Sequence, residues 1–458
     1  MYILNNWFKL FVFFCLNIVL ILSLQFFISW YDYYYYIVNL MVNNIGVLNI
    51  MYLLSLDNIA IVFLLLTAFL LIVCLVLNWY IIYKELLLNI LILLTFVILI
   101  NIFLVNDLFI FFFFFESIVV PMFLLIGIWG SRTRKIRAAY LLLLYTLFGS
   151  IFSLFAFLFL YQCVGSTNFI FLAGIDLNNI NASLLFIFCF IGFSVKIPIV
   201  PLHLWLPEAH VEAPTMGSIL LAGILLKLSF YAFLRLLFLC SNGWYLILVY
   251  TILFIGFLVP CFSAFVQLDI KKIIAFSSVS HMNFGMFGLF SKNFIGFLGC
   301  FYLMIGHALV ASILFFFIGI LYDRYKTRIL LYYGGLFLIM PLWSFFFFLA
   351  ILANFGLPGT INFVGEFMVL LSIFKLTIII PLFLFLGLLL TLGYSLFLYN
   401  RIAHGFLKNE FIRFYSDITR KEFFILISLI IMIYLWGLKP QILINFLFTV
   451  SYYLFCLI

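Results

Sequence analysis

Long apolar runs separated by short polar stretches follow one another along the whole chain. The runs are continuous rather than alternating, and each approaches the ~20 residues that a helix needs to cross a bilayer, which favours helices over barrel strands. We therefore expect an all-α polytopic membrane protein. The predicted segments are 7–30, 58–80, 86–105, 107–130, 138–161, 183–202, 215–239, 244–265, 272–290, 293–321, 334–355, 359–376, 377–400 and 423–447.

Two of these segments, 334–355 and 359–376, meet at the short sequence NFGLPG. We interpret them as halves of one broken helix, which membrane proteins tolerate where the break is buried in protein or lines a cavity. This interpretation leaves 13 spans, no soluble domain, and no linker longer than the polar stretch 401–421.

The basic residues test this count of spans, because positive charge gathers on one side of a membrane. Of the 22 Lys and Arg residues, 15 fall in loops on one side: Lys84, Arg132, Arg134, Lys135, Arg137, Lys271, Lys272, Arg324, Lys326, Arg328, Arg401, Lys408, Arg413, Arg420 and Lys421. The other side holds Lys292, Lys375 and Lys439, with Arg235 near that end of its helix and Lys9 unassigned. The positive-inside rule places the larger group on the cytoplasm-equivalent face, which is the matrix in a mitochondrion.

The composition agrees with this class. Of the 458 residues, 69% are hydrophobic and only 8% are charged, against about 25% charged in soluble proteins. These values exclude a soluble enzyme, a disordered tail protein and a nucleic-acid binder, although the net charge is +8. The eight cysteines form no CxxC pair and read as buried thiols, no metal or haem site is visible, and no cleavable signal or transit peptide is evident.

Six ionisable side chains lie well inside the predicted spans, where insertion scales put the cost of a charge at about 2.5–3.5 kcal/mol. They are Glu116, Lys196, Lys227, His281, His307 and Glu366. Because the chain carries so little charge elsewhere in its spans, each of them is a candidate for function.

Glu116 follows five consecutive phenylalanines. A lone carboxylate there carries a proton unless a cation pairs with it, so Glu116 is either a proton-carrying acid or half of a structural ion pair. Lys196 is followed by Pro198 and Pro201, which break a helix because proline lacks a backbone donor and clashes with the preceding turn. Lys196 is either a proton-exchanging group or a lysine that snorkels to the interface.

Lys227 lies in the middle of its span, where snorkelling is harder, and this position favours a functional role. His281 and His307 lie in consecutive spans. A lone histidine in a helix is often a hydrogen-bonded core residue, but two of them favour a relay, because imidazole exchanges protons near neutral pH.

Glu366 lies beside the second Gly/Pro break, seven residues after Gly359. Interrupted segments at corresponding places in two halves are the best sequence pointer to a transporter site. Lys196 and Glu366 are the two residues at such breaks, which predicts two related halves at roughly 107–239 and 244–400.

These groups predict a chain of proton-exchangeable side chains near the bilayer midplane, with water bridging the gaps. Moving one charge across the membrane potential costs about 2.3 kcal/mol per 100 mV. The sequence holds no GxxxxGK[ST] nucleotide loop and no redox centre. The energy must therefore come from another subunit or from a coupled ion gradient.

Several stretches resemble the antiporter-like subunits of respiratory complex I. The longest is VKIPIVPLHLWLPEAHVEAPTMGSILLAGILLKLSFYAFLR, and the others are FESIVVPMFLLIGIWG, RAAYLLLLYTLFGS, AFSSVSHMNFGM, GHALVASILF and LANFGLPGTINFVGEF. The resemblance covers about 57–447. The sequence HVEAPTMGS and the glutamate at 366, where the sister subunits usually have lysine, favour one of the three sisters.

The resemblance implies a 14-helix subunit of the membrane arm, with two inverted five-helix repeats and one broken helix in each. It implies proton pumping driven by NADH oxidation and quinone reduction in other subunits, which would hold the FMN, the iron–sulfur clusters and the ubiquinone, while this chain holds no cofactor. The expected partners are the other membrane-arm subunits, including the two sister antiporter-like subunits, together with lipids and no nucleic acid.

The resemblance also implies a role for each candidate residue. Glu116 is similar to the acid that pairs with Lys196 and modulates its proton affinity, and Lys227 is similar to the central relay lysine. The remaining three are similar to two histidines of the central hydrophilic axis and to the terminal acid on the output side: His281, His307 and Glu366.

The expected organisation is one transmembrane domain over 1–458. It divides into N-terminal helices, a first repeat, a second repeat, and an amphipathic loop with a C-terminal helix: 1–106, 107–239, 244–400 and 401–458. The family has two helices before residue 57, where this sequence predicts one span. The missing helix is either lost or divergent and tucked into 31–56.

Two other functions stay open at this point. A subunit of a multi-subunit Na⁺/H⁺ antiporter shares the fold and the long signature, and a structural membrane scaffold would need no relay. The 65 Phe and 26 Tyr residues have A/T-rich codons, which indicates an A/T-rich genome such as an organellar one. The expected location is the mitochondrial inner membrane, with a bacterial plasma membrane as the alternative.

Overall fold

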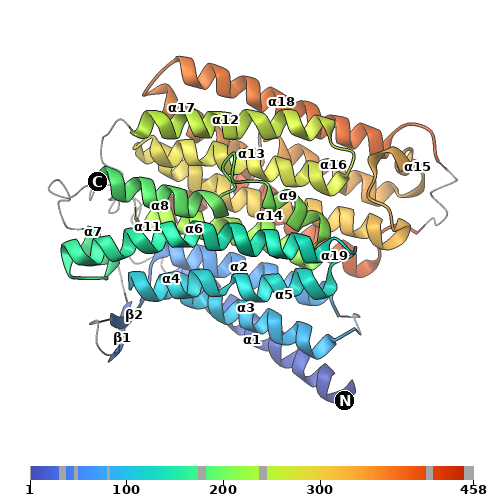
Figure 1. Ribbon diagram of the computed structural model, residues 1–458. Coiled ribbons are helices and arrows are strands. Elements are labelled where there is room, and N and C mark those ends of the chain that lie inside the picture. Colours follow the sequence, from blue (N-terminus) through green and yellow to red (C-terminus); the bar gives the residue numbers. More distant parts are fainter. Residues whose placement is uncertain are drawn as a thin grey trace.

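The chain folds into a bundle of helices that run side by side (Figure 1). The computed structural model describes residues 2–29, 38–45, 50–79, 83–173, 182–236, 245–408 and 416–447. Within these residues, ten helices are long and apolar enough to cross a membrane, with α4 and α5 counted together as one span and α10 to α11 as another.

The elements before residue 237 are α1 (Tyr2–Ser29), β1 (Val38–Ile45), β2 (Ile50–Leu56), α2 (Asn58–Leu77), α3 (Glu85–Leu104), α4 (Leu108–Ser117), α5 (Val119–Trp129), α6 (Lys135–Val164), α7 (Phe169–Ala173), α8 (Ala182–Lys196), α9 (Trp205–Glu212), α10 (Thr215–Leu220), the π-helix η3 (Leu221–Leu225) and α11 (Leu226–Arg235). The later elements are α12 (Tyr245–Val266), α13 (Ile270–Phe290), α14 (Phe294–Tyr325), the 3₁₀ turn η5 (Leu330–Tyr332), α15 (Leu336–Ile339), α16 (Pro341–Asn354), α17 (Ile361–Phe374), α18 (Ile379–Ala403) and α19 (Arg420–Leu438).

Most predicted spans begin and end within a few residues of an observed helix. The largest differences are at the segment expected from 334, because α16 begins only at Pro341, and at the segment expected to reach 447, because α19 ends at Leu438. Gly335, with a left-handed φ of +66°, directly precedes the short helix α15, and the fixed φ of proline suits the first position of α16. The long segments contain few polar residues. Their ends are therefore marked by Gly, Pro and charged residues, which can be identified in the sequence.

Residues 38–45 and 50–56 form the two strands of a hairpin and not the tucked helix that was one of the two alternatives. β1 and β2 pair antiparallel, with Val38 opposite Leu56 and a bulge between Val42 and Asn44. The sequence VNLMVNNI has three asparagines among its eight residues, so it is too polar for a spanning helix. Residues 31–37 and 46–49 of the expected tucked segment lie outside the described part of the chain.

Side-chain contacts gather the loops of the predicted basic face at one end of the bundle. Arg328 donates to Val211 O and to Ser131 Oγ, so three loops meet at this guanidinium. Arg324 pairs with Glu422 at 2.8 Å, which joins the end of α14 to the start of α19. These contacts confirm that the loops lie together; which compartment they face stays a prediction.

Lys9, unassigned from the sequence, belongs to this same face. Its ammonium group donates to Trp79 O at 2.7 Å, just after α2, and forms an ion pair with Glu85, the first residue of α3. At the other end of the bundle, Arg235 pairs with Asp57 just before α2 begins. Thus α1 crosses from the basic face, the hairpin lies at the opposite face, and α2 returns (Figure 1).

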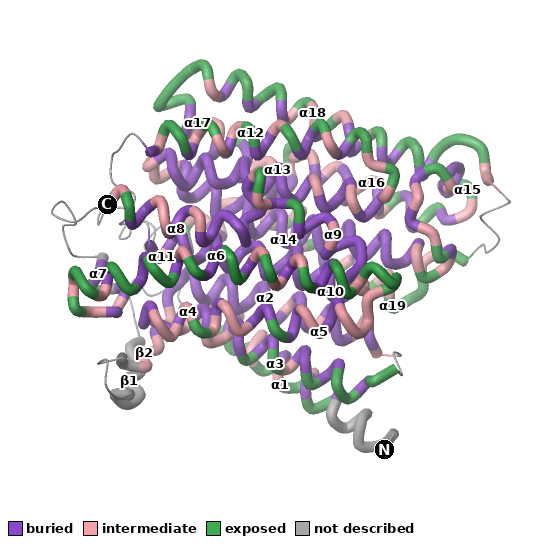
Figure 2. The backbone as a smooth tube through the Cα atoms, in the orientation of Figure 1, coloured by how far each residue is buried: buried purple, intermediate pink, exposed green. Residues whose placement is uncertain are grey.

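Burial divides the helices into a central and a peripheral set. α13 and α14 are buried along nearly their whole length, whereas α6, α12 and α18 expose apolar side chains (Figure 2). A helix that is apolar all round belongs inside the bundle, and apolar side chains exposed on the periphery suit a lipid environment. The cysteines follow this division: Cys74, Cys189, Cys261 and Cys300 are buried, but Cys163 is exposed, contrary to the expectation of buried thiols throughout.

Both predicted helix breaks are present, and local hydrogen bonds satisfy backbone groups that the breaks release. Between α8 and α9, the indole of Trp205 donates to Val195 O at 2.8 Å. Between α16 and α17, the amide of Asn362 donates to Ala353 O at 3.0 Å. Irregular backbone inside a membrane protein requires such partners because no bulk water is present to supply them. The boundaries proposed for the two repeats stay a prediction.

Candidate functional site

An ion pair joins α4 to the end of α8. The Lys196 ammonium lies 2.9 Å from Glu116 Oε1 and 2.7 Å from Phe115 O, and it sits 3.3 Å from the centroid of the Phe115 ring. The Lys196 side chain is only 2% exposed, so it does not snorkel to the interface. Because Lys196 is the last residue of α8, its charge also meets the negative end of the helix dipole.

The position of Lys227 depends on a wider turn in its helix. The π-helix η3 directly precedes α11, and π-turns leave backbone carbonyls free to accept from side chains. The Lys227 ammonium donates to one such carbonyl, Ala222 O, at 2.5 Å. Its other close contact is His307 Nδ1 at 2.9 Å. Lys227 is buried and has neutral partners rather than a carboxylate.

The two histidines extend this contact toward Glu366. The rings of His307, on α14, and His281, on α13, have centroids 5.7 Å apart. His281 Nδ1 lies 3.5 Å from Glu366 Oε1, on α17. All three side chains are buried. Four predicted residues, from Lys227 to Glu366, therefore form one continuous row across packed helices.

Close backbone approach fixes the end of this row at Glu366. Gly356, in the break before α17, has φ +73°, and a Cβ there would collide with the Glu366 carboxylate. Deeper in the helix, a Cβ on Gly365 would lie 2.7 Å from the backbone N of Leu303, so α17 packs directly on α14. Small residues of this kind let membrane helices approach closely.

The structure does not join the two groups of predicted residues directly. Among the described residues, no hydrogen bond or ion pair links the Glu116–Lys196 pair with Lys227. The helices that carry the two groups are joined by aromatic contacts: Phe193 of α8 contacts Phe115 and Phe233, with ring centroids 5.7 and 5.1 Å apart. Proton transfer between the two groups needs water or a rearrangement of side chains.

A further histidine, which is not among the six candidates from the sequence, lies between the row and the basic face. His210, on α9, stacks on Phe315 with ring centroids 4.6 Å apart, and neither ring nitrogen has a hydrogen-bond partner among the described residues. Lys271, at the start of α13, is also buried and donates to Ala213 O at 2.9 Å. A signal for His210 exists in the sequence, because it belongs to the longest motif, but its polar neighbours suggest a place at the membrane interface.

Near the other end of the row, a cavity of about 10 Å³ lies beside the α16–α17 break. Its polar lining includes Ser277, Asn354, Tyr394 and Ser395. A cavity of this size with polar walls holds about one water molecule. The search for ionisable groups in the sequence did not select any of these four residues, because their neutral side chains give no charge signal.

Comparison with known proteins identifies the family that carries this arrangement. Residues 105–393 match the family described as NADH:quinone oxidoreductase/Mrp antiporter, TM. The NADH-ubiquinone oxidoreductase chain 4 of Chondrus crispus is 44% identical over 402 residues, which cover 87% of this chain and 82% of that one. The chain 4 of Marchantia polymorpha is 44% identical over 407 residues, or 88% and 82% of the two chains. The chain belongs to the NADH-ubiquinone oxidoreductase chain 4 family.

Solved structures show the same fold as this member of the chain 4 family. A chain of respiratory complex I from Thermus thermophilus superposes with a TM-score of 0.89 at 24% identity, covering 98% of this chain and 95% of that one. A chain of the Mrp complex from a Dietzia species gives 0.86 at 19% identity, covering 98% and 93%. The predicted fold class and the predicted family are therefore confirmed.

Proposed function

We propose that the chain is a proton-translocating, antiporter-like subunit in the membrane arm of NADH:ubiquinone oxidoreductase. One observation carries the proposal: Lys227, His307, His281 and Glu366 form a buried row across packed helices at the centre of the bundle. Buried ionisable groups are costly in a membrane and mark ion or proton pathways. The 44% identity to relatives named chain 4 supports the assembly to which the chain is assigned.

The geometry supports transfer of a proton along the row. The Lys227 ammonium can pass a proton directly to His307 Nδ1, because the two nitrogens are 2.9 Å apart. The next two transfers, to His281 and then to the Glu366 carboxylate, cover 5.7 Å between ring centroids and 3.5 Å between atoms. A bridging water or a small ring rotation closes these gaps. Each step moves one proton, so the row returns to its starting state once Glu366 has released the proton and Lys227 has been reprotonated.

The Glu116–Lys196 pair acts on this row through its field. While the pair is closed, the carboxylate neutralises the Lys196 ammonium. When the pair opens, Lys196 carries an uncompensated positive charge. This charge raises the free energy of a second cation nearby, so Lys227 gives up its proton more readily. Opening and closing the pair thus biases the row toward release or uptake, and the partner subunits supply the energy for opening.

In this proposal the redox chemistry belongs to partner subunits that hold FMN, iron–sulfur clusters and ubiquinone. The chain contacts other membrane-arm subunits, including its two sister antiporter-like subunits, and it functions in the mitochondrial inner membrane. A subunit of a Na⁺/H⁺ antiporter is the alternative, and the 19% identity to the Mrp chain supports only the shared fold. Copurification of flavin and iron–sulfur subunits with this chain tests the assignment, and their absence would overturn it.

Replacement of Lys227 by alanine tests the relay itself. We expect Lys227→Ala to abolish proton pumping through this subunit, because His307 then loses the buried donor within hydrogen-bond reach. Proton uptake into vesicles per NADH oxidised is the measurement, made on the assembled complex. Arg401→Ala, which removes an exposed basic residue outside the row, is the control for assembly. Normal pumping by an assembled Lys227→Ala complex would overturn the proposal and favour a structural role as a membrane scaffold.

A further inference from the structure

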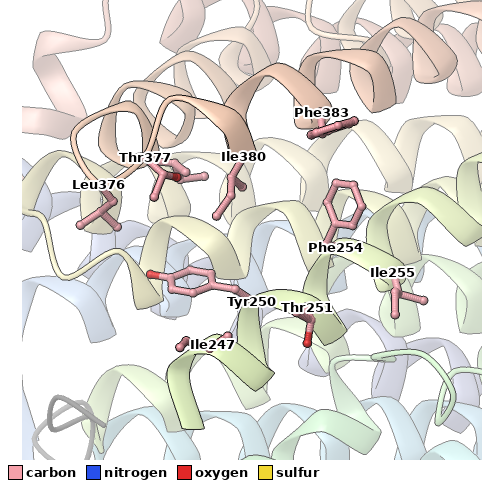
Figure 3. A pocket seen from close by; sticks show the side chains of 10 residues that line it. Ile247, Tyr250, Thr251, Phe254, Ile255, Leu376, Thr377, Ile380 and Phe383 are labelled. Atoms are coloured by element: carbon pink, nitrogen blue, oxygen red, sulfur yellow. The ribbon is translucent and has the colours of Figure 1, made fainter. Parts of the chain in front are cut away.

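An apolar groove runs between α12 and α18 on the periphery of the bundle. Its volume is about 620 Å³. Figure 3 shows Tyr250, Thr251 and Phe254 of α12 facing Ile380 and Phe383 at the start of α18. The hydroxyl of Thr251 does not turn the groove into a polar site, since it donates within its own helix, to Leu248 O at 2.8 Å.

The groove is open at one end and closed at the other. Phe254 and Phe383 meet edge to face with ring centroids 6.1 Å apart. One turn further along α18, Gly387 has no side chain, and the ring of Phe257 packs against its backbone, so the two helices close on each other. From Ile247 to Phe254 the groove follows about 10 Å of helix. The open end lies where α12 and α18 begin, at the face of the membrane opposite the basic loops.

Two of the few basic residues of that face stand at the open end. Lys375 directly precedes the lining residues Leu376 and Thr377, is exposed, and takes part in no ion pair with another described residue. Lys292 lies in the turn between α13 and α14. The neighbouring Asn293 donates to Ser372 O at 2.9 Å, which holds this turn against the end of α17.

A second hydrogen bond ties the same turn to the wall of the groove. The hydroxyl of Tyr250, a lining residue, donates to Phe290 O at 2.7 Å. The two lysines therefore lie at the membrane surface, at the open end of the apolar groove. On that face the described acidic residues are Asp57 and Asp107, and both are engaged elsewhere, with Arg235 and with the start of α4.

We propose that this groove is a binding site for an anionic phospholipid, with one acyl chain between α12 and α18 and the phosphate at Lys292 and Lys375. Burial of methylene groups favours the acyl chain at about 0.8 kcal/mol each, and clustered basic side chains at the membrane surface select anionic head groups. A zwitterionic lipid would fill the groove without using the lysines. A neighbouring apolar protein helix would bury the groove but bring no counter-charge to Lys375.

Photo-cross-linking of lipids to the intact, reconstituted complex tests the site. Two probes with the same diazirine-bearing acyl chain are compared, one a phosphatidylglycerol and one a phosphatidylcholine. We expect the anionic probe to label peptides spanning 245–255 and 376–383 at least about tenfold more than the zwitterionic probe, since each lysine near the surface contributes about a fivefold preference. Labelling is read by mass spectrometry of the digested chain.

Matched variants separate the head-group contribution from the groove. Lys292→Gln with Lys375→Gln should lower labelling by the anionic probe to the zwitterionic level, whereas Lys439→Gln, on the same face, should not. Ile255→Trp should fill the groove and remove labelling by both probes, whereas Leu144→Trp, on the exposed face of α6, should not. Equal labelling by the two probes, no labelling of these peptides, or their cross-linking to another subunit instead of lipid would overturn the proposal.

Discussion

The ion pair between Glu116 and Lys196 holds two charges in a place where neither would be stable alone. The Lys196 ammonium has a carboxylate, a backbone carbonyl and a ring face around it, and almost no access to water. A buried cation with one removable counter-charge is a two-state element, because closing or opening the pair changes the local field by a full charge. This property makes Glu116 the residue at which coupling can be tested most directly.

Neutralising Glu116 should uncouple the subunit. Glu116→Gln leaves the Lys196 ammonium without its counter-charge, and loss of one partner from a buried pair typically costs about 3–5 kcal/mol. We expect a sharp fall in protons pumped per NADH oxidised, whereas Glu116→Asp, which keeps the charge, should largely preserve pumping. Equal activity of the two variants in assembled complexes would count against Glu116 as the group that sets the proton affinity of Lys196.

The sequence supplied the ionisable residues of the row but not their contacts. Lys227 and Glu366 stood out because charge is rare inside apolar runs, and that scarcity can be seen in the sequence alone. The 2.9 Å contact of Lys227 with His307 could not be predicted, because it depends on how two helices far apart in sequence are rotated about their axes. His210 was missed because its neighbours in the sequence are polar, although α9 folds back into the bundle and buries it.

At the scale of helices, the two helix breaks position Lys196 and Glu366. The sequence located both from Gly and Pro alone, because these residues act on the backbone locally. It did not show that the break before α17 would press on Glu366, since this contact needs the left-handed turn at Gly356 together with the packing of α17 on α14. The π-helix η3 was likewise beyond prediction, because an apolar run gives the same pattern in an α-turn and a π-turn.

Gly356→Ala should disturb the output end of the row. Its φ of +73° strains any side chain, and the added Cβ also collides with the Glu366 carboxylate. The control is Gly165→Ala, because Gly165 has the same φ of +73° but open space around it. Both variants carry the backbone strain of about 1–2 kcal/mol, so only the Gly356 variant should lose pumping, measured as protons taken up per NADH oxidised. Equal pumping by the two assembled variants would show that the approach of the break to Glu366 is not required.

At the scale of the whole molecule, the position of the basic face determines the direction in which α1 crosses the bundle. The sequence predicted most of the basic face from the positive-inside rule, and contacts such as Arg328 with Ser131 and Arg324 with Glu422 gather its loops at one end. It could not place Lys9, because an uncertain number of spans before residue 57 leaves the side undetermined. The ion pair of Lys9 with Glu85 decides the question, and the hairpin between α1 and α2 explains it, since a hairpin reverses the chain without crossing the membrane.

Cysteine labelling can test this course of α1. In a background in which all eight native cysteines are replaced by serine, Asn5→Cys and Arg401→Cys should react with a membrane-impermeant maleimide from the same side of sealed vesicles. Lys439→Cys should react from the other side, because it follows α19, which begins on the basic face. The physical reason is that a single span, α1, separates the start of the chain from the hairpin. If Asn5→Cys instead reacts from the side of Lys439→Cys, residues 30–57 must contain a second crossing, and the course of α1 described above would be wrong.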